Sequence, residues 1–565
     1  MKKFINIISV VILVVLLSAC EDRFLRVNTS VNNLTPQDLA ADLGFGTRFA
    51  SLLNNLHSAQ TGEDLSTDHY IRHMGTPTDF LNNRNNTTYT IEAGWNNQTW
   101  NTIYNNVMAP ANQIKKLADE AGLPLFSAWA ELIQVFGLSR LTVYHGPLIY
   151  SEYGQILDQF EYDTEKELYD QFFAKLDEVE AVFVTASNDP AQKGLLTKFD
   201  VPYSGDLAKW LKMMNSLRLR LAIRISKADP GLAKIQGEKA MSDPVGLVLA
   251  NSENFARSLN GGTPLLWTMS ESWGDTRMGS ALEEVLVGYK DPRAHVWFQP
   301  ADASVLPAGR DPEWPYKGIS GGSLLPNNAK ERMSFSKVST NFQQPNWNMK
   351  MYLDAAEINF ALAEARLRGW SGSIENNTVQ YYYENGVKRS WEFWQGKQLA
   401  GHKMMRDYSV DTYLNDATSK PLARIVDPLD GGDNSYDSRM TDPEAYTVKW
   451  RDDVSKEKQL ERIITQKWIA AYNNANEVWS DHRRTGYPKL NFNIKNDKNP
   501  LFGAVADNDF LKRMPFAAQD IGVNAAHAAG IPASKLPAPG LDLITTALWI
   551  HTPWVDHSNP NNNLP

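Results

Sequence analysis

Cysteine occurs only once among the 565 residues, at Cys20, and this scarcity limits how the chain can be stabilised. A disulfide framework and a cysteine-rich zinc site each need several cysteines, so neither can hold the fold together. Hydrophobic residues make up 42% of the chain and charged residues 21%, as in soluble globular proteins. The fold must therefore depend on a large hydrophobic core. At 565 residues the chain exceeds one ordinary core of about 100–200 residues, which predicts several domains or one extended array.

The segment before Cys20 predicts export and lipid attachment. Two lysines precede a mostly apolar run over 4–17, which has the length of a signal-peptide core and is too short to span a bilayer comfortably. The run ends in Leu-Ser-Ala-Cys, which resembles a bacterial lipobox, where the cysteine is acylated and becomes the first residue of the mature protein. We therefore predict a signal peptide over 1–19, acylation of Cys20 and a polar tether over 20–35.

The rest of the chain has the apolar spacing of helices, so the predicted fold class is mainly α. Over 206–225, apolar residues recur every three or four positions, with Asp206 as the N-cap and Pro230 ending the run. Further helices are predicted over 351–368, where alanines allow close helix packing, and over 461–479. Strand-like alternation is rare. Other helical patterns cover 36–56, 98–120, 124–143, 164–183, 278–288 and 505–512.

Long polar stretches separate the helices, at about 58–94, 258–349 and 410–450. Loops of this length in a compact protein are usually functional or disordered. Tryptophan rings in such loops can stack on sugar rings or grip peptide side chains, with little entropy lost because tryptophan has two χ angles. Five tryptophans fall within one such region: Trp267, Trp273, Trp297, Trp314 and Trp347.

Four residues are predicted to contact a ligand: Trp95, Trp273, Trp314 and Arg72. Trp95 follows an asparagine-rich loop, just before a helix whose core face already has other aromatic residues. Trp273 lies in a polar segment without apolar periodicity, and Trp314 lies between two prolines in a stiff, extended stretch. Arg72 would add a charge-assisted hydrogen bond to a hydroxyl or carboxylate. The alternative for any single loop tryptophan is that it packs its own loop.

Sequence motifs of catalysis and of cofactor binding are missing. There is no P-loop, nucleophile elbow or dinucleotide-binding glycine fingerprint. His69 and His73 have i,i+4 spacing but lack the glutamate of a zincin, which favours a polar loop or a ligand contact over a metal site. The oxygen-rich segment 430–437 lacks the order of an EF-hand, which favours an exposed turn over a calcium site. The net charge of −9 argues against nucleic acid as a partner.

Three pairs of charged residues are interpreted as structural. Adjacent residues on a helix diverge and residues seven apart lie two turns apart, so the glutamate pairs fit a solvated face or ion pairs better than acid–base catalysis. The arginine pair is expected to form ion pairs. The pairs are Glu283/Glu284, Glu357/Glu364 and Arg483/Arg484.

Motifs spread over nearly the whole mature chain resemble those of the SusD/RagB family of surface nutrient-binding lipoproteins. One departure is Arg513-Met-Pro, because the family usually has tyrosine directly before this proline. The matching segments are 203–226 with Asn-Ser-Leu-Arg-Leu-Arg-Leu-Ala, 291–293 with Asp-Pro-Arg, 355–370 with Ala-Glu and Ala-Glu-Ala, 383–390 with Tyr-Glu-Asn-Gly, and 466–488 with Arg-Arg-Thr-Gly-Tyr-Pro.

The resemblance implies a single domain over 36–565, a superhelix of tetratricopeptide-like helix pairs with ligand-binding loops on one face. It also implies a non-catalytic lid that captures an oligosaccharide or an oligopeptide and delivers it to a TonB-dependent SusC-type transporter of the outer membrane. The acidic pair Glu21-Asp22 resembles the export signal of surface lipoproteins, which would place the protein on the cell exterior. A surface enzyme that degrades the same ligand and a bracing lipoprotein are the alternatives. The residues leave glycan and peptide both open.

Overall fold

The protein is described from a computed structural model that covers most of the chain after the predicted tether. The predicted signal peptide, Cys20, the tether and the segment 430–437 lie outside the described residues. The described residues are 45–80, 86–158, 160–189, 197, 200–258, 263–323, 330–344, 347–423, 447–517, 531–538, 541–561 and 563–564.

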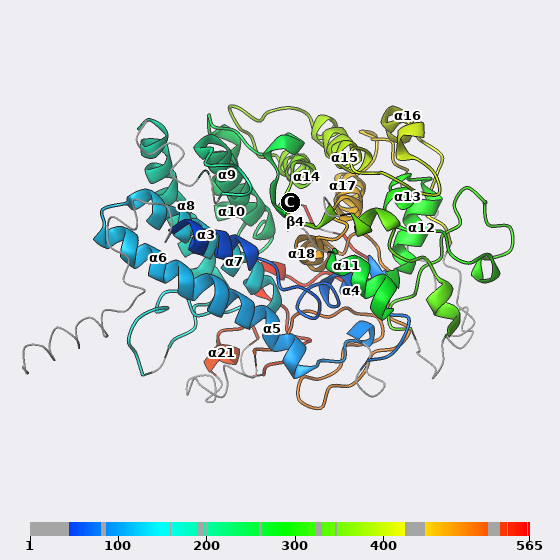
Figure 1. Ribbon diagram of the computed structural model, residues 1–565, viewed down its shortest axis with the longest axis horizontal. Coiled ribbons are helices and arrows are strands. Elements are labelled where there is room, and N and C mark those ends of the chain that lie inside the picture. Colours follow the sequence, from blue (N-terminus) through cyan, green and yellow to red (C-terminus); the bar gives the residue numbers. More distant parts are fainter. Residues whose placement is uncertain are drawn as a thin grey trace, which may run out of the picture.

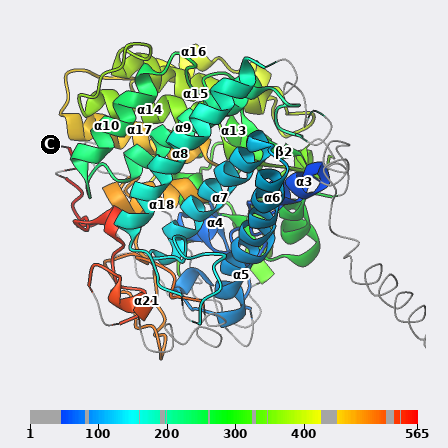
Figure 2. The ribbon, with the colours of Figure 1, turned by 90° about the vertical axis from the view of Figure 1, so that its left-hand side faces the viewer.

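The first half of the described chain is an array of helices in which sequence neighbours pack against each other (Figure 1). A five-residue π-helix, η2 (Tyr104–Met108), joins α5 and α6 into one continuous helical stretch, in agreement with the predicted helix over 98–120. Figure 2 shows the array from the side, with α6 to α10 following one another. The helices are α3 (Phe45–Asn54), α5 (Ala93–Ile103), α6 (Ala109–Glu120), α7 (Pro124–His145), α8 (Glu165–Ser187), α9 (Leu207–Arg224) and α10 (Pro230–Ser242).

The second half contributes two further helix pairs, and α14 joins them to the first half by packing on α9, α15 and α17. Gly386 of α15 allows the close approach to α14, because a Cβ at this position would lie 2.7 Å from the ring of Phe360. These pairs give the mainly helical fold that the sequence predicted. The helices are α14 (Ala355–Leu367), α15 (Val379–Gln395), α17 (Lys456–Ala470) and α18 (Ala475–Thr485).

Two short antiparallel sheets pair the long segments between the helices with one another. β1 (Met74–Gly75) pairs with β3 (Arg277–Met278), and β2 (Phe255–Ser258) pairs with β4 (Met349–Leu353). The predicted loops therefore contain regular structure. Their other short elements include α4 (Thr67–Tyr70), η1 (Asn86–Thr88), α11 (Leu265–Trp267), η4 (Thr268–Trp273), α12 (Ser280–Gly288), α13 (Arg293–Trp297), η7 (Thr340–Gln343) and α16 (Val410–Leu414).

Helix α9 forms where the periodicity predicted it. Asp206 caps the helix, since its side chain accepts hydrogen bonds from the backbone N–H groups of Ala208 and Lys209 at 3.0 and 3.2 Å. Trp210 is fully buried, and its indole Nε1 donates to Asp200 at 2.7 Å. Contrary to the prediction, Pro230 is not the residue that ends this helix, because α9 ends at Arg224. Pro230 is instead the first residue of α10, a position where a missing N–H costs nothing.

Three other predicted helices differ from the structure. Residues 349–353 form strand β4, so the helix predicted over 351–368 begins only at Ala355. The helix predicted over 461–479 is divided into α17 and α18 at Asn473, whose φ of 64° is a left-handed conformation that asparagine tolerates. Residues 505–512 form no helix; a turn closed by the Asp509 N–H to Ala506 O bond at 3.1 Å interrupts them.

Buried ion pairs join α9 to α14 and α18. Arg220 of α9 donates from Nε and Nη2 to the two carboxylate oxygens of Glu357 of α14, at 2.7 and 2.6 Å. Arg224, one turn further along α9, donates from Nε to Glu477 of α18 at 3.0 Å. Burial alone would raise the pKa of Glu477, but Arg224, Lys467 and Arg220 together lower it to about 2. The charged face of α9 is thus part of the protein interior.

A second set of buried ion pairs joins α14 to α17 and α18. Arg484 donates to Glu364 and to Asp481, both at 2.8 Å, and Lys467 contacts Asp481 at 2.7 Å. The structural interpretation of Glu357, Glu364 and Arg484 is therefore confirmed. Arg483 is also structural, but in place of the expected ion pair its guanidinium donates to backbone carbonyl oxygens and lies 3.5 Å from the centre of the Trp479 ring.

We predict that Glu477→Gln destabilises the protein by about 3–5 kcal/mol at pH 7, because it leaves Arg224 buried without its anion. The pKa of Glu477 is lower in the folded chain, about 2, than its ordinary value of 4.5. Its charge therefore stabilises the fold above pH 4.5, and this contribution is lost as the pH falls toward 2. Urea unfolding of both proteins at several pH values should show a difference that shrinks below pH 4.5; a constant difference would contradict the assignment.

Candidate ligand-binding site

Trp273 has the exposed ring that the sequence predicted. It is the last residue of the π-helix η4, and its side chain is 51% exposed. Glu271 anchors this helix by accepting hydrogen bonds from Gln299 at 2.8 Å and from Lys337 at 3.1 Å. The chain turns away at Gly274, whose φ of 76° favours glycine. An exposed aromatic ring therefore stands on an anchored turn, which lowers the ordering cost of stacking on a ligand.

Trp95 lies at the start of α5, beside a recess of about 340 Å³, its open mouth included. Glu92 caps the helix by accepting the backbone N–H of Trp95 at 2.8 Å, and the half-buried indole ring packs edge-on against Phe80. We call this hollow the Trp95 recess. Besides Trp95, Tyr70 and Tyr144, its wall is mostly hydroxyls and amides: Thr61, Ser66, Asn86, Thr90, Asn96 and Thr99.

Asn96 leaves an unpaired acceptor in the wall of the Trp95 recess. Its Nδ2 donates to the carbonyl oxygen of Pro515 at 3.0 Å, which fixes the amide in one orientation. Its Oδ1 is buried and has no hydrogen-bond partner. A buried acceptor without a partner costs free energy, so a hydroxyl or N–H group of a ligand would be bound favourably here. The recess can therefore offer an aromatic face and hydrogen bonds to one ligand.

Trp314 does not present its ring, contrary to the prediction. The side chain is only 2% exposed, and its ring stacks on His295 with centroids 4.5 Å apart. Tyr408 lies on the same cluster at 6.0 Å. The two prolines beside Trp314 keep the segment out of a helix, as predicted, but the segment folds inward over His295. Trp314 thus packs its own loop.

Arg72 is also buried, so its guanidinium is not presented to a ligand at the surface. It donates to the hydroxyl of Tyr89 at 3.0 Å, to the carbonyl oxygen of His69 at 3.1 Å and to Asn493. The contact with Asn493 holds the segment after α4 against a segment 421 residues away in the sequence. The predicted contact of Arg72 with a ligand is therefore replaced by a role in the loop core.

The two histidines of the i,i+4 pair are structural. His69 Nδ1 lies 3.0 Å from the carbonyl oxygen of Asp64, and His73 Nε2 lies 2.9 Å from that of Trp468. Burial lowers the pKa of His69 to about 4 and that of His73 to about 3, so both stay neutral near pH 7. Over the described part of the chain, no group of three or more His, Cys, Asp or Glu side chains is placed to hold a metal ion.

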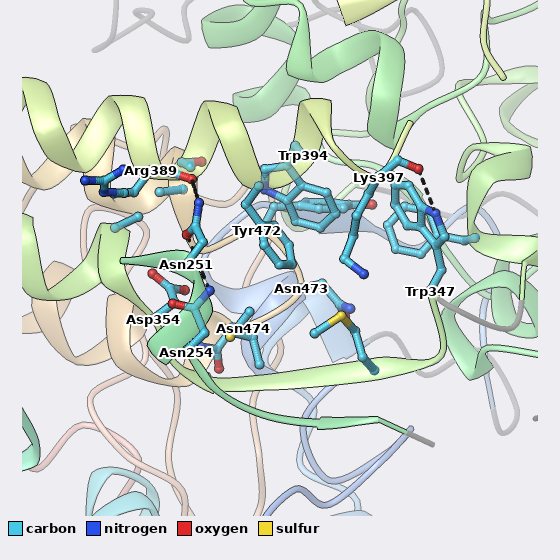
Figure 3. A pocket seen from close by; sticks show the side chains of 17 residues that line it. Asn251, Asn254, Trp347, Asp354, Arg389, Trp394, Lys397, Tyr472, Asn473 and Asn474 are labelled. Carbon is cyan, nitrogen blue, oxygen red and sulfur yellow. Dashed lines mark hydrogen bonds between the residues drawn. The ribbon is translucent and has the colours of Figure 1, made fainter. Parts of the chain in front are cut away.

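A larger pocket of about 590 Å³, its open mouth included, lies between β4, α15 and the turn that joins α17 to α18 (Figure 3). We call it the Trp347 pocket. Its wall divides into an aromatic end and a polar end. The aromatic end comprises Phe342, Trp347, Phe393, Trp394 and Tyr472, and the polar end comprises Asn251, Asn254, Asp354, Arg389 and Asn474.

Sequence reasoning singled out Trp347 but missed the rest of this pocket. Phe393 and Trp394 lie in α15, where aromatic residues are usually explained by core packing. Apolar periodicity predicts one long helix through Asn473-Asn474, although two adjacent asparagines favour a turn. The polar residues come from segments distant in the sequence, and only the fold brings them together.

Comparisons with known proteins agree with this architecture. The family described as SusD-like, "Susd and RagB outer membrane lipoprotein", matches residues 26–551. A chitin-binding SusD homologue from Flavobacterium johnsoniae is 30% identical, with a TM-score of 0.78, over 90% of this chain and 99% of that chain. A SusD homologue from Bacteroides vulgatus is 28% identical, with a TM-score of 0.77, over 91% of this chain and 99% of that one. No curated protein matches the chain.

The family match extends over most of the chain, and the solved homologues share its fold over about 90% of the chain. The chain therefore belongs to the SusD/RagB family of outer-membrane lipoproteins, which are non-catalytic binding proteins. Its fold is the family's array of tetratricopeptide-like helix pairs. Within the ranges that the structure describes, no helix is both long and apolar enough to cross a membrane.

We predict that Trp314→Ala and Trp273→Ala affect stability very differently. Removing the buried ring of Trp314 should cost about 3–5 kcal/mol through lost burial and a residual cavity. Removing the exposed ring of Trp273 should change stability by no more than about 0.5 kcal/mol. Chemical unfolding of both variants tests this, and equal losses would show that one of the two rings is placed wrongly.

Proposed function

We propose that the protein captures an oligosaccharide of N-acetylated sugars at the cell surface and delivers it to a TonB-dependent transporter of the SusC type. The observation that carries the choice of ligand is the chitin-binding homologue, which is 30% identical over 90% of this chain. Chitin consists of N-acetylglucosamine units, whose pyranose rings have apolar faces and whose edges carry hydroxyl and acetamido groups. Such a unit matches an aromatic ring flanked by hydroxyls and amides.

The Trp95 recess supports a glycan over a peptide. Its hydrogen-bonding wall is mostly neutral, and its one carboxylate, Glu92, already accepts the helix N-terminus. Among the described residues, no lysine or arginine lines this recess, although a peptide carboxylate would favour one. Arg72, whose guanidinium would suit a peptide carboxylate, is engaged within the protein. Trp95 and Trp273 remain our candidates for ring stacking.

We predict that Trp95→Ala and Trp273→Ala each weaken binding of chitotetraose by about 1–3 kcal/mol, or roughly 5- to 150-fold, through the loss of one stacking ring. Titration calorimetry on the soluble mature chain measures this. The matched control is Tyr381→Ala, which removes an exposed aromatic ring on α15, away from both hollows.

Two further titrations identify the ligand class. Cellotetraose, which lacks acetamido groups, should bind at least tenfold more weakly than chitotetraose, and an oligopeptide mixture should give no heat of binding. If the parent binds peptide and no glycan, the proposed ligand is wrong. If both tryptophan variants bind like the parent, the site lies elsewhere.

The anchor follows from the sequence. Acylation of Cys20 would hold the mature chain on the membrane, since each buried CH₂ of an acyl chain contributes about 0.8 kcal/mol. We predict that Cys20→Ser moves the protein from the membrane fraction to the soluble fraction, or blocks its maturation. Fractionation in cells that lack the transporter checks this, because the transporter could otherwise retain the protein. Full membrane retention there would contradict lipid attachment.

A further inference from the structure

The Trp347 pocket is separate from the Trp95 recess, since the two hollows share no lining residue. It lies against α15 and β4 in the second half of the chain, whereas the Trp95 recess lies at α5 in the first (Figure 1). Pockets that combine apolar walls with a few polar groups are typical small-molecule sites. No part of the proposed function uses this pocket.

The aromatic end is rigid before any ligand arrives. The rings of Trp347 and Trp394 lie 5.6 Å apart, and the Trp347 indole donates to the carbonyl oxygen of Lys397 at 3.0 Å. Tyr472 stacks on the buried Trp297 with centroids 4.5 Å apart and an interplanar angle of 16°. The core therefore holds these rings in place, and little conformational entropy remains to be lost when a ligand packs against them.

The polar end is fixed by backbone hydrogen bonds (Figure 3). Asn251 donates to the carbonyl oxygen of Arg389 at 2.9 Å, and Asn254 accepts the N–H of Ala355 at 2.9 Å. Asp354 caps α14, and its burial raises its pKa to about 6. Amide and carboxylate groups in fixed positions select a ligand by the placement of its hydrogen-bonding groups.

Asn474 leaves a hydrogen bond unmade at this end of the pocket. It is the N-cap residue of α18, yet its side chain makes no capping hydrogen bond. Its side chain is buried, and its Oδ1 has no partner. The neighbouring Asn473 holds the turn in a left-handed conformation, with φ of 64°. A donor supplied by a ligand would satisfy the Asn474 oxygen and remove the cost of burying it unpaired.

We propose that the Trp347 pocket is a second saccharide site, which holds one pyranose unit beside Phe393, the half-buried ring of the aromatic end, with a hydroxyl or acetamido N–H donated to Asn474 Oδ1. The choice of N-acetylated sugar rests on the proposed function; the site itself rests on the geometry of the pocket. A pyranose suits both ends, because it has an apolar face and an edge with several hydrogen-bonding groups. An aromatic side chain of a peptide would leave most of the polar end without partners. The two cations of the lining are engaged within the protein, since Arg389 pairs with Glu392 at 2.8 Å and Lys397 Nζ lies 5.3 Å from the centre of the Phe393 ring.

The test counts bound ligand with a short probe. Chitobiose is titrated by calorimetry into the full mature chain carrying Cys20→Ser, and the parent is expected to bind two molecules per chain. Phe393→Ala removes a half-buried ring of the pocket wall, and Ala470→Leu fills the pocket without removing a contact. Each is expected to reduce the stoichiometry to one. Tyr381→Ala, on the same helix as Phe393, should leave it at two.

The complementary variant separates this proposal from the proposed function. A Trp95→Ala/Trp273→Ala double variant should keep one chitobiose site, and adding Ala470→Leu should abolish it. If the parent binds one chitobiose and the double variant binds none, the second site is ruled out and the proposed function still holds. Absence of any chitobiose binding by the parent would overturn the ligand class for both sites. As a folding control, each variant must melt within about 2 °C of the parent. Phe393→Ala and Ala470→Leu block the pocket by different mechanisms, so the test still holds if one of the two variants does not fold.

Discussion

The bidentate contact between Arg220 and Glu357, deep between α9 and α14, sets the geometry of much of the molecule. A charge this far from water is tolerated only with its partner in place, so the two helices can pack in essentially one register. Glu357 lies in the first turn of α14, directly after Asp354 and strand β4. The ion pair therefore also fixes where the strand ends and where the polar end of the Trp347 pocket begins.

The family motifs and the ligand site have different physical origins. Arg220, Glu357, Glu364, Glu477 and Arg484 all lie within motif segments, and all of them form the buried ion pairs between helices. The scaffold needs these ion-pairing residues in order to assemble, whichever ligand the protein binds. Trp95 and Trp273 lie on segments outside these motifs. A homologue of 28–30% identity can thus share the whole fold, while its ligand depends on few residues.

Sequence periodicity predicted the long helices because each buries one apolar face, as α9 does around Trp210. It could not predict the break at Asn473, where the same apolar pattern continues across a left-handed residue. Sequence periodicity also could not predict which single aromatic rings are exposed. Trp273 and Trp314 have similarly polar neighbours, and only long-range contacts, with His295 and Tyr408, bury Trp314. The Trp347 pocket escaped prediction for the same reason, since its walls come from distant segments.

All 17 tryptophans lie within the described residues, and Trp273 is the one whose side chain is more exposed than buried. This has a spectroscopic consequence. Most indoles of the protein sit in the core and emit from an apolar environment, whereas the Trp273 ring meets water. A dissolved quencher such as iodide would act most strongly on that ring and less on the partly exposed indoles such as Trp95, so the most quenchable part of the fluorescence reports on the turn at Trp273. The native protein thus carries its own optical label at the position where the loops face solvent.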